Sequence, residues 1–154
     1  MQNAGAIVQV VYTLYTTYAS GSTIWPLDDT IPQNTDGDEF ITRAITPTNA
    51  SNILMIEAVV CAGRVSSTTG AGCGIFQDST AACLNSGTIV SSSVGNGGIP
   101  MVLRHFMAAG TTSSTTFKLR AGDEQASNFK MNGTNTRMYG GTMTSSLTIT
   151  EIAV

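Results

Sequence analysis

The stretch from Thr30 to Ala62 reads TIPQNTDGDEFITRAITPTNASNILMIEAVVCA, and it decides the fold. It contains two predicted strands, Asp38 to Ile45 and Ile53 to Ala62, separated by turn-forming residues from Pro47 to Asn52. Side chains alternate between the two faces of a strand. The second strand is apolar on both faces, with Ile53, Met55, Val59 and Cys61 on one and Leu54, Ile56, Ala58 and Val60 on the other. Both faces therefore need cover. We expect the chain's own second sheet on one face and an identical subunit on the other.

The composition is typical of strands and turns. Charged residues make up only 11% of the 154 residues, and there are 16 glycines. A chain of this length is expected to form a single domain, residues 1–154. The low charge disfavours a monomer that exposes many Val, Ile and Met side chains, and burial in an assembly would remove that difficulty.

Charge, cysteines and hydropathy exclude several classes of protein. A net charge of −3 gives no basic surface for nucleic acid. The three cysteines, Cys61, Cys73 and Cys83, have no metal-binding spacing, and we interpret them as small buried apolar residues of a protein that folds in a cytoplasm. The N-terminus lacks the basic region of a signal peptide, and no apolar run is long enough for a membrane helix.

The rest of the chain predicts further short strands, eight to ten in all, with turn signals between them. This pattern favours an all-β jelly-roll sandwich of two antiparallel sheets. We expect loops at Gly63 to Gly72 and Gly87 to Gly98, and a hairpin turn at Asn132-Gly133. The other predicted strands are Ala6 to Tyr12 with a continuation to Ser20, Cys73 to Gln77, Pro100 to Ala108, Ser114 to Ala121 and Met143 to Val154.

The strand Pro100 to Ala108 is also apolar on both faces, which again predicts a subunit contact. Charged groups lie within these strands, and an unpaired buried charge would cost several kcal/mol. We therefore expect Glu57 or Glu151 to meet Arg104 or Arg43 at or near a subunit boundary. The predicted interface residues are Met55, Glu57, Val59, Met101, Leu103, Arg104, His105 and Glu151. Closed symmetry suits such contacts, and we expect a homotrimer.

The sequence predicts no catalytic residues, cofactor or metal. His105 lies in mid-strand, and no GxSxG motif is present. The acidic pairs Asp28/Asp29 and Asp36/Asp38 fit turns better than a glycosidase or a calcium loop. Gly70, Gly72 and Gly74 match a nucleotide-binding motif only in their letters, because no helix is predicted after them, and we assign them to a loop.

Four segments resemble the small trimeric jelly-roll domains of tailed bacteriophages, whose architecture is similar to the tumour-necrosis-factor-like heads of animal proteins. They follow the order of that family and read TIPQNTDGDEFITRAITPTNASNILMIEAVV (Thr30 to Val60), FQDSTAACL (Phe76 to Leu84), TTFKLRAG (Thr115 to Gly122) and GGTMTSSLTITEIAV (Gly140 to Val154). The resemblance implies a non-enzymatic protein on the virion exterior, folded in the bacterial cytoplasm, and it carries over no catalytic residue.

Two roles follow from this resemblance. As a decoration or cement protein, the chain would bind capsid proteins through Trp25, Val8 and Val10 and stabilise the head. As the head of a tail fibre, it would bind a host surface glycan or protein through the loops Gly63 to Gly72, Ser91 to Gly98 and Gly122 to Thr136. A fibre head normally follows a shaft, so a chain that begins at Met1 favours the decoration role.

Overall fold

The computed structural model describes residues 5–64, 70–90, 99–126 and 128–154. These residues form ten β-strands and one short 3-10 helix, Tyr139–Gly141. The strands are β1 (Ile7–Tyr15), β2 (Ala19–Ser20), β3 (Asp38–Ile45), β4 (Ile53–Arg64), β5 (Gly70–Gln77), β6 (Asn85–Val90), β7 (Ile99–Ala108), β8 (Thr115–Asp123), β9 (Phe129–Met131) and β10 (Ser145–Ile152).

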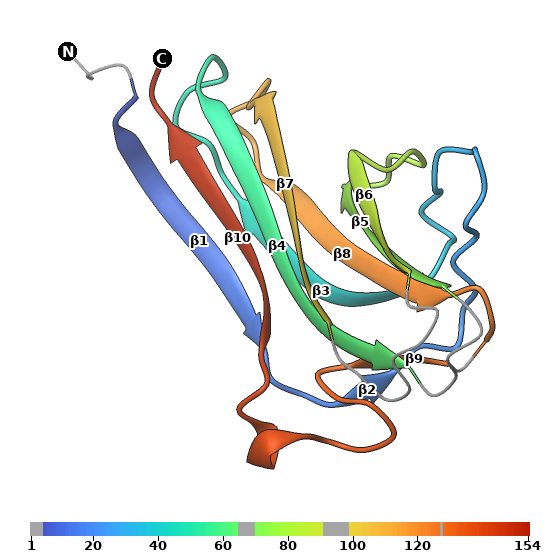
Figure 1. The fold of residues 1–154 in the computed structure, drawn as a ribbon. Helices are drawn as coiled ribbons and strands as arrows, with labels where there is room; N and C mark the ends of the chain where they lie inside the picture. The colour runs from blue at the N-terminus through green and yellow to red at the C-terminus, as the bar shows by residue number, and fades with distance from the viewer. Residues whose placement is uncertain (1–4, 65–69, 91–98, 127) are drawn as a thin grey trace.

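The strands form two antiparallel sheets that face each other (Figure 1). The first sheet has the order β1-β10-β4-β7; the short strand β9 pairs with the last residues of β4, and β2 pairs with β9. The second sheet has the order β3-β8-β5-β6. Without β2 and β9, the eight remaining strands have the spatial orders 1-8-3-6 and 2-7-4-5, which is the connectivity of a jelly roll. The predicted all-β jelly-roll sandwich is confirmed.

The core lies between the two sheets and is built by alternate residues of each strand. In β8, Phe117, Leu119 and Ala121 are fully buried while the residues between them are half-buried, as the alternation predicts. The same rule holds in β4, where the even-numbered residues from Leu54 to Ala62 are buried. The inward-facing residues of the first sheet include Leu54, Ile56, Ala58, Val60, Leu103, Leu147 and Ile149, and those of the second include Ile41, Ile45, Ala71, Cys73, Ile75, Phe117, Leu119 and Ala121.

Two predicted loops are partly strand. β6 runs through the start of the predicted loop Gly87 to Gly98, whose residues 91–98 lie outside the described residues. Gly87 faces the core, where an added Cβ would stand 2.7 Å from the Met101 sulfur, so this glycine serves packing rather than a turn. β5 likewise begins at Gly70 instead of Cys73, within the predicted loop Gly63 to Gly72.

The hairpin predicted at Asn132-Gly133 is wrong. β9 ends just before it and pairs with β2 and β4, whereas Gly133 forms only an isolated bridge with Arg137. Asn132 has a positive φ of 55°, as a turn residue can. Its side-chain amide donates hydrogen bonds to the carbonyls of Tyr15 and Thr17 at 2.6 and 3.1 Å, so it ties down the link between β1 and β2.

Trp25 covers the outer face of the second sheet. Its side chain is only 2% exposed and packs on a stripe of glycines. A Cβ added to Gly72 would stand 2.2 Å from the indole Nε1, and one added to Gly74 would stand 2.8 Å from the ring. Phe76 meets the ring edge-on, with the ring centroids 6.4 Å apart. Gly70, Gly72 and Gly74 are therefore strand residues; the missing side chains of Gly72 and Gly74 admit the indole, and that of Gly70 admits Leu27.

We expect Gly72→Ala to lower the free energy of unfolding by about 1–3 kcal/mol, because the new methyl group collides with the Trp25 indole. The same substitution in a Trp25→Leu background should cost clearly less, since the smaller side chain leaves room. Urea unfolding followed by circular dichroism measures both. Equal losses in the two backgrounds would show that Gly72 is required by the strand itself rather than by Trp25.

Candidate functional site

The outer face of the first sheet is an apolar surface that the described part of the chain leaves uncovered. The pairing of β1, β10, β4 and β7 aligns its outward-facing residues in rows across the sheet. The four rows are Ile7-Ile152-Ile53-Ala108, Val10-Thr150-Met55-Phe106, Tyr12-Thr148-Glu57-Arg104 and Leu14-Ser146-Val59-Val102. We call these sixteen residues the outer face.

The exposure of these side chains is unusual for a soluble domain. Six large apolar side chains of the outer face, on the edge strands β1 and β7, are exposed by about half or more: Ile7, Val10, Tyr12, Leu14, Val102 and Phe106. The apolar residues of β4 between them are half-buried. Single exposed apolar residues are ordinary, but a contiguous set on one sheet marks a surface that binds something.

One ion pair lies inside this apolar surface. Glu57 of β4 and Arg104 of β7 are directly opposite in the strand register, and Arg104 Nε donates to Glu57 Oε2 at 2.9 Å. A second guanidinium nitrogen, Nη2, contacts the same oxygen. In the chain alone, Arg104 is 54% exposed at the side chain, so the pair contributes little to stability. Its charges cancel, which leaves the outer face without net charge.

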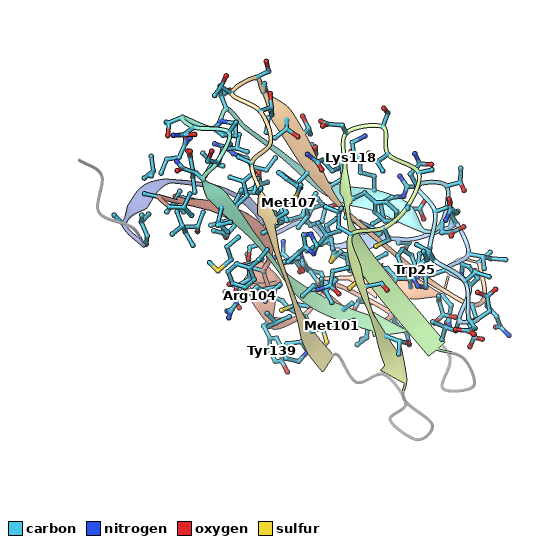
Figure 2. All side chains as sticks on the ribbon, turned by 90° about the horizontal axis from the view of Figure 1, so that it is seen from above. Trp25, Met101, Arg104, Met107, Lys118 and Tyr139 are labelled. Carbon is cyan, nitrogen blue, oxygen red and sulfur yellow. The ribbon has the colours of Figure 1, made fainter. Side chains whose placement is uncertain are left out.

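The outer face of the second sheet has a different character. Lys118 and Arg120 of β8 lie 3.5 and 3.8 Å from the Glu39 carboxylate, and Trp25 covers the glycine stripe of β5. Figure 2 places Trp25 and Arg104 on opposite sides of the molecule. In the described residues, the outer surface of the second sheet is therefore covered by Trp25 or carries charged side chains. The outer face of the first sheet is mostly apolar and uncovered.

The predicted interface residues divide between the two faces of the first sheet. Met55, Glu57, Val59 and Arg104 lie on the outer face, but the other four point into the chain's own interior. The Met101 sulfur lies 3.6 Å from the Cys73 sulfur, Leu103 is 6% exposed, and His105 is half-buried opposite Ile56. For Met101, Leu103 and His105 the wrong face of β7 was chosen, because both of its faces are apolar.

Sequence reasoning also missed most of the outer face on β1 and β7. Tyr12, Leu14, Val102 and Phe106 are among its most exposed side chains. A signal was available, because Arg104 alternates with Val102 and Phe106, and a charged residue between two apolar ones indicates the outward face of a strand.

Glu151 is fully buried and belongs to the interior, not to a surface. Its carboxylate receives hydrogen bonds from the side chains of Gln9 (2.6 Å), Asn52 (2.7 Å) and Thr48 (2.8 Å) and from the Thr48 backbone N–H (2.9 Å). The prediction that Glu57 or Glu151 meets an arginine is confirmed for Glu57 and Arg104, whereas the groups that bind the Glu151 carboxylate are uncharged. Burial alone raises the pKa of this carboxyl, but the hydrogen bonds outweigh burial and lower the pKa to about 2.

The three residues predicted to contact a capsid do not share a surface. Trp25 is buried against the second sheet, Val8 is half-buried in β1, and Val10 is exposed on the outer face of the first sheet. The first and the last lie on opposite sides of the sandwich, so a single docking surface cannot include both.

The cysteine thiols are poor nucleophiles. Burial, with a smaller contribution from nearby Cys83, raises the pKa of Cys73 to about 12. Burial also raises the pKa of Cys83 to about 11, despite hydrogen bonds to the backbone of Asn85 and Ile75. Both thiols are protonated at neutral pH, whereas thiol chemistry requires the thiolate. Among the described residues, no group of three His, Cys, Asp or Glu side chains is close enough to hold a metal ion.

Comparisons with known proteins add no identification: no protein-family model matches the chain, and neither does any curated protein. In the described segments, no helix has the length and apolar character needed to cross a membrane.

We expect Glu151→Gln to destabilise the protein at neutral pH and to flatten its acid sensitivity. Because the folded pKa of about 2 lies below the ordinary 4.5, the carboxylate stabilises the fold above pH 4.5, and this contribution is lost as the pH falls towards 2. The shift corresponds to roughly 3 kcal/mol.

Urea unfolding at several pH values between these limits measures the effect. Asp29→Asn, at an exposed carboxylate, is the matched control and should keep the wild-type pH dependence. An unchanged pH dependence in Glu151→Gln would show that other carboxylates cause the acid sensitivity.

Proposed function

We propose that the chain is a non-enzymatic structural protein that assembles into a homotrimer through its outer face. The observation that carries this proposal is the set of exposed apolar side chains on β1 and β7 of the outer face, which no described segment covers. Exposed apolar area of this kind is the main driving force for association between subunits.

An identical subunit suits this surface better than a charged partner. The outer face is mostly apolar, its polar residues being the uncharged Ser146, Thr148 and Thr150 of β10 and the ion pair Glu57–Arg104, so it offers no net charge for complementarity. Four strands about 4.8 Å apart and about 20 Å of strand length give a projected area on the order of 400 Å². This projection is about half of the roughly 800 Å² that each partner buries in a stable interface, and the accessible area of a corrugated sheet is larger than its projection.

The trimer is inferred from the resemblance to phage jelly-roll domains together with this surface. Around a threefold axis, each subunit turns the same sheet towards the axis and contacts both neighbours. The Glu57–Arg104 pair would then leave water, and the pairing of the two charges within one chain would avoid an isolated buried charge.

The inferred role is decoration of a tailed-phage head on the virion exterior, after folding in the bacterial cytoplasm. A trimer that presents three copies of a rigid sandwich can stabilise a shell by burying surface against several capsid subunits. The protonated thiols of Cys73 and Cys83 and the interior position of His105 favour a role without catalysis. A second candidate, the receptor-binding head of a tail fibre, is favoured by a groove on the opposite side of the molecule, beside Trp25.

We expect the wild-type protein to have three times the monomer mass of 16.0 kDa in size-exclusion chromatography with light scattering. Phe106→Glu places a charge among the exposed apolar side chains of the outer face and should shift the protein to monomer. Ala44→Glu adds the same charge at an exposed position of β3 in the second sheet and should leave the mass unchanged. A wild-type monomer at micromolar concentration would refute assembly, and a dimer would refute the threefold symmetry.

The copy number of the chain per purified virion tests the role. Quantitative mass spectrometry, normalised to the major shell protein, should find hundreds of copies if the protein decorates the head, because a decoration protein follows the capsid lattice. A few tens of copies or fewer would place the protein on the tail or a fibre and would favour the second candidate. A chain missing from the virion would contradict both roles.

A further inference from the structure

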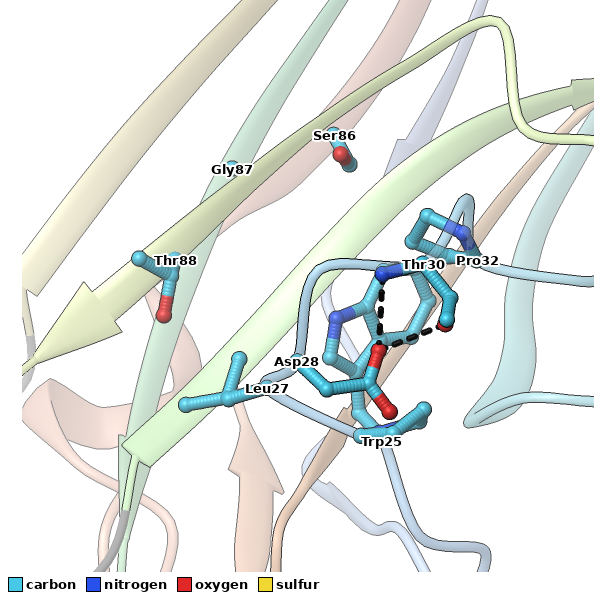
Figure 3. Close-up of a pocket in the computed structure, with 9 residues that line it drawn as sticks. Trp25, Leu27, Asp28, Thr30, Pro32, Ser86, Gly87 and Thr88 are labelled. Carbon is cyan, nitrogen blue, oxygen red and sulfur yellow. Dashed lines mark hydrogen bonds between the residues drawn. The ribbon is translucent and has the colours of Figure 1, made fainter.

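A groove runs along the outer side of β6, opposite the Trp25–Pro32 segment. It consists of two adjoining clefts of about 390 and 410 Å³, which share Asp28, Thr30, Pro32 and Ser86 in their walls. Figure 3 shows Ser86 and Thr88 on β6 and, across from them, Leu27, Asp28 and Thr30. We call it the β6 groove. Each cleft lies within the usual size range of small-molecule sites, about 300–1,000 Å³.

The wall opposite β6 is held in place by several contacts. The segment that forms this wall begins at Trp25, whose indole packs on the glycines of β5. The backbone N–H of Trp25 donates a hydrogen bond to the Asp123 carbonyl at 2.9 Å. Asp28 Oδ1 accepts hydrogen bonds from the Thr30 N–H at 3.0 Å and from the Thr30 hydroxyl at 2.5 Å. The Pro32 carbonyl accepts from the Cys83 N–H at 2.9 Å, which ties the end of the segment to the residues before β6. The groove is therefore preformed rather than a gap between loose loops.

Hydrogen-bonding groups and small apolar side chains alternate in the β6 groove. Ser86 offers an exposed hydroxyl, and Thr88 donates its own to the Ala71 carbonyl at 3.0 Å, so its oxygen remains an acceptor. Trp25 lines one cleft, and its indole Nε1 lies against Gly72 of β5. The remaining lining residues include the apolar Pro26, Leu27 and Pro32.

The charge of the β6 groove limits the chemical class of ligand that it can bind. Among the described residues that line the two clefts, none is Lys, Arg or His, and Asp28 and Asp29 supply the charges. A phosphate, a sulfate or a sialic acid would be repelled by these carboxylates and would find no cation. Uncharged hydroxyl groups suit carboxylate, hydroxyl and indole partners, and the C–H face of a pyranose ring suits proline and leucine side chains.

We propose that the β6 groove binds a neutral oligosaccharide, with the apolar wall against the sugar ring and Ser86, Thr88 and Asp28 bonded to its hydroxyls. The two adjoining clefts accommodate neighbouring sugar units. This site is independent of the outer face and of the decoration role, and it supplies a specific contact for the second candidate function.

The fluorescence of Trp25 tests the proposal, because it is the only tryptophan of the chain and lines the groove. The intact wild-type protein is titrated with neutral trisaccharides of glucose, galactose, mannose and N-acetylglucosamine, and with sialyllactose as the anionic counterpart. We expect a saturable change with at least one neutral trisaccharide and none with sialyllactose. Ser86→Tyr fills the groove and should weaken binding about ten-fold or more.

Ser114→Tyr, at an exposed position before β8 that does not line the groove, is the matched control and should bind like the wild type. The mass of every variant is measured in parallel, so that loss of the site is distinguished from loss of assembly. The proposal is overturned if no neutral trisaccharide changes the fluorescence at millimolar concentration, if sialyllactose binds better, or if Ser86→Tyr binds like the wild type. Binding only of an extended peptide along β6 would also overturn it.

Discussion

The structure depends on one constraint, which is that β4 is apolar on both faces. A β-strand inside a sheet has two faces, and water cannot cover an apolar one without a cost in free energy. The second sheet covers the inner face through Phe117, Leu119 and Ile75, which are fully buried. On the outer face, Met55 and Val59 remain half-buried, with the apolar Phe106 and Val102 of β7 on one side and residues of β10 on the other. Within the described part of one chain, the jelly roll therefore covers only the inner face of β4.

The two sheets meet the same requirement in different ways. The second sheet has no side chains at Gly72 and Gly74, and the Trp25 indole covers the backbone there. Glycine weakens a strand because it loses more conformational freedom on folding, and the burial of Trp25 offsets that cost. The first sheet has full apolar side chains and no such cover. This asymmetry separates the outer face, which we propose as the surface for assembly, from the side of the molecule that forms the β6 groove.

Buried polar groups connect the elements that the apolar core does not specify. Glu151 of β10 gathers hydrogen bonds from Gln9 of β1 and from Thr48 and Asn52 of the turn before β4. Asn132 ties the carbonyls of Tyr15 and Thr17 in the same manner. Such bonds add modest net stability, but an unsatisfied buried group is costly, so they select one arrangement of turns around the sandwich.

The sequence by itself determined the strands and the class of fold, because the two-residue alternation of a strand is a local property that Asp38 to Ile45 and Ser114 to Ala121 display plainly. It also identified β4 as a strand that needs cover on both sides. Only the tertiary structure decided which face of β7 points outward, since both faces are apolar and the choice depends on the neighbouring strands. The tertiary structure also decided which groups bind Glu151 and which glycines pack against Trp25, because these contacts join residues about 50 to 140 positions apart in the sequence.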